Sequence, residues 1–285
     1  MQPDPVAIFE AQRPRLLRLA YRMLGSRAEA DDVVQEAWLR WQTAKRDVIA
    51  QPAAWLIRVT SRLCLDQMKS ARSRRETYPG TWLPEPLIDE DDDALRPDNL
   101  TLTLMLALER LSPLERAAFL LHDVFGQSLE EVAKTIDRTP AAARQLASRA
   151  RAHVRVDQPR YKVRPDEAEE LTRAFFSACQ TGDAAALAAM LAEGATLHSD
   201  GGGKRFSYPN VIAGADRLVR LFVSLSRKQD GQMEYLEAVT IDGLPGFICR
   251  LDGPPQTTAL EIVGGLITAI YITRNPDKLK RIPLH

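Results

Sequence analysis

Residues 101–155 place the strongest constraint on the fold of this 285-residue chain, because they hold three helix starts in close succession. Ser112 and Pro113 form a side-chain cap followed by a ring-fixed first residue, which predicts a helix. Ser128 begins a shorter helix with two glutamates in its first turn, where acidic groups suit the helix dipole. Thr139 begins the third helix in the same way as Ser112. The segment therefore predicts a compact helical unit with a tight turn before its last helix.

That last helix carries a basic face. Its apolar residues recur at helical spacing and predict the buried side, so that arginine and amide side chains point outward. Five arginines and no acid occur between residues 138 and 155. A helix-turn-helix presents such a second helix to the major groove of DNA. The alternative, a solvated charged face, normally mixes charges of both signs. The candidate DNA-reading residues are Arg144, Gln145, Ser148, Arg149 and Arg151.

Whole-chain charge does not indicate a polyanion partner, because 38 basic and 38 acidic residues cancel. The charges are instead segregated into basic helices and an acidic linker. The first ten residues show neither a basic leader nor an apolar core, and no apolar run reaches the length of a membrane span. We therefore expect a cytoplasmic protein with no membrane contact.

The three cysteines are widely separated and include no Cys-x-x-Cys pair. This pattern argues against a disulfide framework and against a zinc ribbon. It predicts that Cys64, Cys179 and Cys249 are reduced and mostly buried. We expect no bound metal and no cofactor.

Residues 6–75 predict three helices, over 6–24, over 26–41 and from Pro52 to about residue 75. On periodicity alone, the polar face of the second helix is typical of a solvated surface. The third helix carries a basic stripe, with Trp55 and Tyr78 near its ends, and these aromatic residues suggest stacking on nucleic-acid bases. The alternative is a surface helix whose aromatic residues complete the core. The candidate DNA-binding residues of this helix are Trp55, Arg58, Arg62, Lys69 and Arg72.

A proline-rich and then acidic segment, residues 79–100, lies between the two basic units and predicts an extended linker. Trp82 and Leu83 are exceptions in this polar stretch, and apolar groups of that kind usually dock on a domain or a partner. After a second linker at about 157–170, helices give way to strand patterns that turn at Asp242-Gly243 and Gly264-Gly265. This order predicts an α+β domain with a mostly antiparallel sheet.

Two of these segments resemble the sigma-70 family of bacterial transcription initiation factors, in its extracytoplasmic-function group. AYRMLGSRAEADDVVQEAWLRW, residues 20–41, is similar to region 2 of that group, and residues 111–154 are similar to its region 4. The remainder resembles the subgroup with a SnoaL-like extension, whose marks are WLPEPL at 82–87, DGGGK at 200–204 and NPDKL at 275–279.

The resemblance implies two all-α sigma domains followed by an α+β cone. The expected boundaries are a region 2 domain at 1–78, a linker with the WLPEPL motif at 79–100, a region 4 helix-turn-helix domain at 101–156 and a SnoaL-like regulatory domain at 157–285.

The resemblance also implies partners, namely promoter DNA and core RNA polymerase with its β′ and β subunits. The polar face of the second helix is implied to bind the β′ coiled coil through Asp32, Gln35, Glu36 and Arg40. The helix from Pro52 is implied to engage and help melt the promoter element near the start site. Region 4 is implied to read the distal element with the arginine-rich face described above.

The extension is implied to regulate the sigma domains in place of a separate anti-sigma protein. Because Trp82 and Leu83 stand out in a polar linker, we expect WLPEPL to dock against the DGGGK turn and to keep regions 2 and 4 closed. The residues expected in this regulatory contact are Trp82, Leu83, Pro84, Asp200, Gly201, Gly202, Gly203, Lys204, Asn275, Pro276 and Asp277.

Two alternatives stay open from the residues alone. An enzyme with a DNA-binding head would need an acid or a base inside the cone, and His198 and Asp200, two positions apart on a strand, are weak candidates. A helix-turn-helix repressor with a C-terminal ligand sensor would leave the second basic helix unexplained. The sequence identifies neither the promoter, the inducing signal nor a ligand of the extension, and it does not say whether the extension activates or inhibits.

Overall fold

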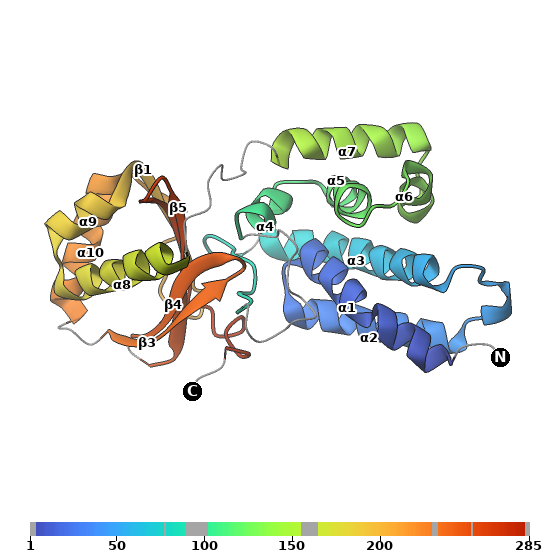
Figure 1. Cartoon of the computed structure of the whole chain (residues 1–285), viewed down its shortest axis with the longest axis horizontal. Coiled ribbons are helices and arrows are strands. Elements are labelled where there is room, and N and C mark those ends of the chain that lie inside the picture. The colour runs from blue at the N-terminus through green and yellow to red at the C-terminus, as the bar shows by residue number, and fades with distance from the viewer. Residues whose placement is uncertain are drawn as a thin grey trace. The chain divides into compact units, whose positions relative to one another are not determined.

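The chain forms two compact units (Figure 1). The computed structural model describes residues 4–76, 78–88, 102–154, 165–229, 233–251 and 253–282, without the side chains of 70–76, 165 and 229. The first unit holds the described residues of Met1–Glu76 and Thr103–Gln158. The second holds those of Thr77–Asp91, Asn99–Leu102 and Pro159–His285, so the start of the linker belongs to the C-terminal unit.

The first unit begins with three packed helices, α1 (Pro5–Leu24), α2 (Arg27–Thr43) and α3 (Pro52–Glu76), with a short 3-10 turn at Arg46–Val48. Asp4 caps α1, and Gly25, in the left-handed region at φ 69°, ends it. Trp41 and Leu56 are fully buried where the helices meet. The three predicted helices are therefore confirmed.

The rest of the first unit is the predicted helix-turn-helix, in elements α4 (Leu102–Glu109), α5 (Pro113–Phe119), a π-helical turn η2 (Leu120–Val124), α6 (Leu129–Ile136) and α7 (Pro140–Val154). Ser112 and Ser128 each cap their helix in a reciprocal capping box with the glutamate three residues later. Asp137 makes the turn between α6 and α7 in the left-handed conformation, at φ 55°.

The second unit is a six-stranded sheet with helices on one face, as the predicted α+β class requires. The helices are α8 (Pro165–Thr181), α9 (Ala184–Met190) and α10 (Ala215–Gln229). The strands are β1 (Leu191–Asp200), β2 (Ile212–Ala213), β3 (Glu234–Ile241), β4 (Leu244–Arg250), β5 (Pro255–Val263) and β6 (Leu266–Thr273). The order is β2-β1-β6-β5-β4-β3, and of the described pairs only β1 and β6 run parallel. Both predicted hairpin turns, at 242–243 and 264–265, have positive φ at their two central residues.

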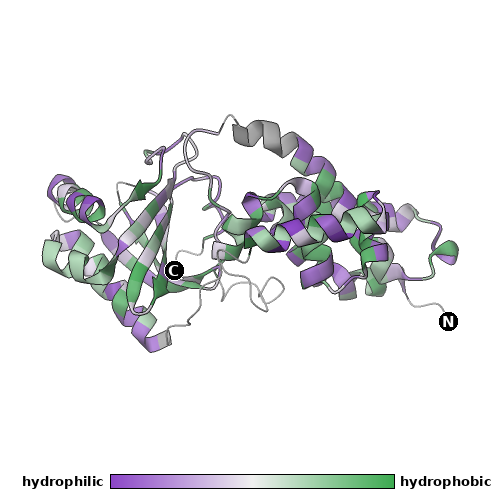
Figure 2. Ribbon diagram, turned by 90° about the horizontal axis from the view of Figure 1, so that it is seen from above, coloured by the Kyte–Doolittle hydropathy of each residue, from purple (hydrophilic) through white to green (hydrophobic). Residues whose placement is uncertain are grey.

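Both faces of this sheet are covered. Leu197, Phe247 and Leu260 point toward the helices and belong to the main core of the unit. Because side chains alternate along a strand, Thr257 and Tyr271 point to the opposite face, and they too are buried. Covering on both faces explains why the strands are apolar along much of their length (Figure 2). The opposite face is covered by the linker.

Candidate functional site

The linker is held on the sheet by a buried carboxylate. Asp200 ends β1, and its side chain is 0% exposed. Its Oδ1 accepts hydrogen bonds from the Tyr78 hydroxyl at 2.5 Å and from the Gly202 N–H at 3.0 Å. Its Oδ2 accepts from the Leu83 N–H at 2.9 Å and from Lys278 Nζ at 2.7 Å. Four donors, one of them charged, compensate for burying this carboxylate.

Lys278 joins the linker to the same point. Its ammonium group also donates to the carbonyl of Leu83. It lies 4.2 Å from the centre of the Trp82 ring and 5.2 Å from that of Tyr78, within the range of cation–π attraction. The side chain is 11% exposed, so the Asp200–Lys278 pair is shielded from water.

The glycine run after Asp200 is required by close packing. Gly202 and Gly203 have φ of 62° and 69°. A Cβ on Gly202 would lie 2.4 Å from Asn275 Cγ, and one on Gly203 would lie 2.6 Å from Pro79 Cγ. Asn275 in turn donates to the Tyr78 hydroxyl at 2.9 Å. Burial, and next the hydrogen bond to Asp200, raises the pKa of Tyr78, so its hydroxyl stays protonated and can donate.

A second carboxylate-bearing turn fixes the other end of the docked linker. The Asp242 N–H donates to the Leu87 carbonyl at 2.9 Å, and the Leu87 N–H donates to Asp242 Oδ2 at 3.3 Å. The Leu102 N–H donates to the Asp242 carbonyl at 2.8 Å. Leu87 and Leu102 are therefore both fixed to one turn of the sheet.

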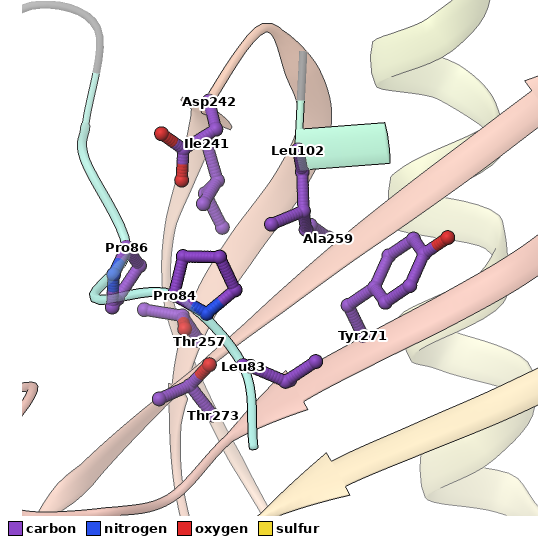
Figure 3. Close-up of a pocket in the computed structure, with 10 residues that line it drawn as sticks. All are labelled: Leu83, Pro84, Pro86, Leu102, Ile241, Asp242, Thr257, Ala259, Tyr271 and Thr273. Carbon is purple, nitrogen blue, oxygen red and sulfur yellow. The ribbon is translucent and has the colours of Figure 1, made fainter. Parts of the chain in front are cut away.

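Between these two anchors the linker packs closely on the sheet. Figure 3 shows Leu83 and Pro84 beside Thr257, Tyr271 and Thr273. The space left there is about 10 Å³, which admits one water molecule at most. We call the contacts of residues 78–88 with Asp200, Asp242, Asn275 and Lys278 the linker dock.

The linker dock brings together most of the residues expected in the regulatory contact. Leu83 and Pro84 are buried, Trp82 and Pro276 are half-buried, and Gly201 packs closely on the carbonyl of Arg205. Lys204 and Asp277 instead form an exposed ion pair at 2.5 Å, beside the linker dock. The Lys204 ammonium holds the pKa of Asp277 below its usual value.

Sequence reasoning missed three residues of the linker dock. Lys278 belongs to the NPDKL motif, but only the first three positions of that motif were selected. Tyr78 was considered for base stacking, whereas its hydroxyl binds Asp200 and Asn275. Asp242 was interpreted only as a turn residue. Lys278 could have been found from the sequence, because Asp200 and the NPDKL motif were both assigned to the regulatory contact. A carboxylate enclosed in such a contact needs a cationic partner, and Lys278 is the cation of that motif.

The weak catalytic candidates do not meet the requirement that they lie inside the cone. His198 and Asp200 share a face of β1, as expected, but this is the face opposite the helices. His198 is half-buried, stacks on Tyr271 at 5.1 Å and lies 3.2 Å from the Thr196 hydroxyl. The carboxylate of Asp200 is fully occupied by the linker dock.

The cysteines are buried and unpaired, as predicted. Burial raises the pKa of Cys64 and of Cys179, and it raises that of Cys249 to about 12. Within the described ranges, no three His, Cys, Asp or Glu side chains come close enough to hold a metal ion. Among those same residues, no helix combines the length and the apolar character needed to cross a bilayer.

In the first unit, α7 presents its basic face to solvent. Arg144, Gln145, Ser148 and Arg149 are exposed. Arg151 differs, because its Nε donates to Asp123 Oδ1 at 2.6 Å and so holds α7 against η2. Four of the five predicted DNA-reading residues are thus available at the surface.

The polar face of α2 is also at the surface. Asp32 and Gln35 are exposed, and Glu36 pairs with Arg40 at 2.9 Å. Leu39 lies on the same helix with 48% of its surface exposed. Sequence reasoning did not select Leu39, although a large apolar residue among polar neighbours was visible in the spacing.

The basic stripe of α3 is largely occupied. The Arg62 guanidinium donates to the carbonyls of Lys134 at 3.0 Å and Thr135 at 3.2 Å, which are the unsatisfied acceptors at the end of α6. Trp55 packs on Trp41, with ring centres 5.5 Å apart. This contact agrees with the alternative in which the aromatic residues of this helix complete the core.

The other three residues of the stripe differ in their surroundings. The Arg58 Nε is buried and has no hydrogen-bond partner among the described residues. Lys69 pairs with Asp66 at the surface. The side chain of Arg72 lies outside the described part of the chain.

Two further arginines join the N-terminal helices to the helix-turn-helix. Arg116 is 1% exposed and donates to the Met23 carbonyl at 2.7 Å and to Glu109 at 2.6 Å. Arg15 donates to the Phe125 carbonyl at 2.9 Å. We call the contacts of Arg15, Arg62 and Arg116 the arginine seam. Beside Arg62 the seam leaves a cleft of about 530 Å³, lined by polar and apolar groups of both helical regions.

Comparison with known proteins gives matches along 98% of the chain. The family model of sigma-70 region 2 matches residues 8–74, and that of sigma-70 region 4 matches residues 101–154. The ECF RNA polymerase sigma factor SigJ of Mycobacterium tuberculosis is 38% identical, over 98% of this chain and 94% of that protein. The probable ECF sigma factor SigI of M. tuberculosis strain H37Rv is 35% identical, over 98% of this chain and 96% of its own length.

A solved structure covers the same length. The crystal structure of the M. tuberculosis extracytoplasmic function sigma factor SigJ has a TM-score of 0.79 and 35% identity to this chain. The match covers 98% of this chain and all of that one. The similarity therefore includes the C-terminal unit as well as the two helical regions.

Proposed function

Because the chain belongs to the extracytoplasmic-function (ECF) family of RNA polymerase sigma factors, we propose that its own C-terminal domain controls how it delivers core polymerase to promoters. The observation that carries the proposal is the linker dock, in which the segment between regions 2 and 4 is bound by the C-terminal unit. In this proposal the protein works in the cytoplasm, where it meets the polymerase.

Polymerase binding is assigned to the exposed face of α2. Asp32, Gln35, Glu36 and Arg40 offer hydrogen bonds and charge, and Leu39 offers an apolar anchor at their centre. Buried apolar anchors surrounded by polar contacts supply most of the affinity of a typical interface. The β′ subunit of the polymerase is the proposed partner of this face.

Promoter recognition is assigned to α7 and α3. The exposed Arg144 and Arg149 are suited to bidentate contact with guanine in a major groove. Arg62 cannot contact DNA while it caps the end of α6. Arg62 of the α3 stripe therefore becomes available only when the arginine seam opens at α6.

Control by the C-terminal domain is assigned to the linker dock. Asp200 holds Tyr78 and Leu83, while the turn at Asp242 holds both Leu87 and Leu102. Fixing the chain at these points shortens the tether between region 2 and region 4. Undocking releases about 25 residues, and a freed chain of that length reaches up to roughly 80 Å. A domain that binds or releases its linker thus sets how far region 4 can move from region 2.

Transcription in vitro with purified core polymerase on genomic promoter fragments tests this proposal. We expect promoter-dependent transcripts from the full chain or from a form ending near residue 160, with a ratio between the two that gives the sign of the control. Equal activity of both forms at every promoter would refute control by the C-terminal domain. Transcripts from neither form, with DNA binding intact, would favour the repressor alternative.

Variants of α7 test the promoter assignment in the same assay. Arg144→Ala and Arg149→Ala are each expected to weaken promoter-specific transcription by about 1–3 kcal/mol of recognition energy, with polymerase binding unchanged. Arg220→Ala, on the exposed surface of α10, is the matched control. Full transcription by both α7 variants would remove these arginines from the recognition surface.

A further inference from the structure

Helix α10 of the C-terminal unit carries cations along its outer face. The helix lies with α8 and α9 on one face of the sheet (Figure 1). Its apolar side is turned to the core through Leu218 and Phe222, which are 0% and 6% exposed. The opposite side is exposed and carries four cations and one hydroxyl. We call these five residues the α10 stripe, namely Arg217, Arg220, Ser224, Arg227 and Lys228.

The α10 stripe is narrow and its charges are of one sign. At about 100° per residue, its five side chains lie within an arc of about 100°. At about 1.5 Å per residue, they extend over about 16 Å along the helix. The acid of this helix, Asp216, lies in the first turn, where it suits the helix dipole. Because a solvated face normally mixes charges of both signs, solvation alone does not account for this stripe.

The cations of the stripe are also the ones that the second unit leaves without a partner. Within the described part of that unit, every other lysine and arginine interacts with a carboxylate, a carbonyl or another group. These engaged cations are Arg173, Lys204, Arg205, Arg250, Arg274, Lys278, Lys280 and Arg281. None of the four cationic side chains of the α10 stripe forms a hydrogen bond or an ion pair with a described residue. Their charge is therefore available to an anionic partner.

The side chains of the stripe indicate the class of this partner. No residue of α10 is among the large apolar side chains that the described surface exposes. A typical protein interface centres on aromatic or apolar anchors, and a helix that lies in a membrane surface inserts its apolar face. The apolar face of α10 is in the core instead. Arginine, lysine and serine side chains are, by contrast, the groups that contact DNA phosphates without reading bases.

We propose that the α10 stripe binds the phosphate backbone of duplex DNA, so that the C-terminal unit contacts DNA directly. One strand presents a phosphate about every 3.4 Å of the duplex axis, so a stripe of about 16 Å spans about five phosphates. The chain belongs to a family of transcription initiation factors, which work on duplex DNA. This contact goes beyond control through the linker dock, because it requires neither docking nor release of the linker.

The salt dependence of DNA binding measures phosphate contacts. Each contact releases condensed counterions, so the logarithm of the association constant falls with the logarithm of the salt concentration, with a slope of about −0.9 per contact. The measurement is fluorescence anisotropy of the full-length protein with a short labelled duplex of arbitrary sequence, over a series of salt concentrations.

Arg217→Gln combined with Lys228→Gln removes two of the four cations and keeps side chains that favour a helix. We expect the slope to become less steep by about 2, and the affinity at the lowest salt concentration to fall at least about tenfold. The thermal midpoint should stay the same, because both side chains are exposed and unpaired.

The matched control is Arg173→Gln combined with Arg250→Gln. It removes the same net charge from the same unit, but at cations that are paired with carboxylates. Its slope should equal that of the wild type. A phosphate contact affects promoter and non-promoter DNA alike, so Arg220→Ala still controls for base reading by α7 when the two DNAs are compared.

Four results would overturn the proposal. They are no binding of the wild type at the lowest salt concentration, an unchanged slope for the α10 variant, and an equal change in the control variant, which would indicate net charge alone. The fourth is normal DNA binding by the α10 variant with weaker co-purification of core polymerase, which would assign the stripe to an acidic protein surface. The anisotropy measurements use neither polymerase nor a promoter, so their failure leaves the proposed sigma activity untouched.

Discussion

The linker dock and the arginine seam hold chain segments in place by different physical means. The dock centres on one fully buried carboxylate with four donors and leaves a space of about 10 Å³ between linker and sheet. The seam uses arginines that donate mainly to backbone carbonyls, and it leaves a cleft of about 530 Å³. Only Arg116 of the seam is deeply buried.

The difference indicates which contact opens first. Removing one partner of a buried ion pair costs about 3–5 kcal/mol, whereas a hydrogen bond at a partly exposed position contributes about 1 kcal/mol. The outer part of the seam, at α6, therefore separates more easily than the linker leaves the sheet. The expected order is that α6 moves away from α3 first, while Arg116 and the linker dock still hold.

Asp200→Asn is expected to have the largest effect. It leaves the ammonium of Lys278 largely buried without its counter-ion, which costs about 3–5 kcal/mol of docking free energy. Cleavage of the full chain by chymotrypsin after Trp82 should then become at least about a hundredfold faster, because the rate follows the undocked population.

The control for this prediction is Asp216→Asn, the same change at an exposed position of α10. The double variant Asp200→Asn with Lys278→Met should recover part of the loss, since no unpaired charge remains. Unchanged cleavage in the single variant would show that the linker dock is as loose as the seam.

Gly202→Ala is expected to destabilise the linker dock by about 2–3 kcal/mol. The substitution adds left-handed strain, about 1 kcal/mol, to an overlap with Asn275 at 2.4 Å. Gly264→Ala separates these two effects, because Gly264 has nearly the same φ, 60°, and nothing within 4 Å of an added Cβ. Chymotrypsin cleavage should rise for Gly202→Ala only, and the thermal midpoint should fall less for Gly264→Ala. Equal falls would mean that packing at Asn275 contributes nothing.

Arg62→Lys is expected to weaken the contact between α3 and the end of α6 by about 1 kcal/mol. Lysine keeps the charge but cannot bond both carbonyls at the end of α6 in a planar fork. Hydrogen exchange of the α6 amides should become about fivefold faster, with no change in cleavage at Trp82. Arg13→Lys, in an exposed ion pair of α1, is the control. Faster cleavage at Trp82 in Arg62→Lys would contradict the separate opening of the two contacts.

Lys204→Met is expected to have the smallest effect, about 0.5 kcal/mol, because the pair with Asp277 is about half exposed. Lys204 and then Lys280 lower the pKa of Asp277 in the folded protein. A lowered carboxyl pKa gives stability that is present above the unfolded value, near 4, and is lost as the pH falls through the folded value. Between pH 7 and pH 3, the free energy of unfolding of the wild type should therefore fall slightly more than that of the variant. An identical pH dependence would show that this pair contributes nothing to the stability of the folded protein.

Local signals in the sequence determined the elements of this protein. Ser112, Ser128 and Thr139 cap their helices, and the paired turn residues at 242–243 and 264–265 form the two hairpins, because these preferences act within a few residues. The DGGGK run was also predicted to be a turn against which the WLPEPL segment docks. Resemblance to a family then supplied the order of the domains.

Only the tertiary structure decided which side chains are engaged. Tyr78 and Asp200 are 122 positions apart, and Arg62 and Lys134 are 72 positions apart, so no local pattern relates them. The sequence therefore assigned Tyr78 and Arg62 to nucleic acid by charge and aromatic character alone. Folding brings a buried carboxylate to the first and unsatisfied helix-end carbonyls to the second, and the need to compensate those groups fixes both side chains in place.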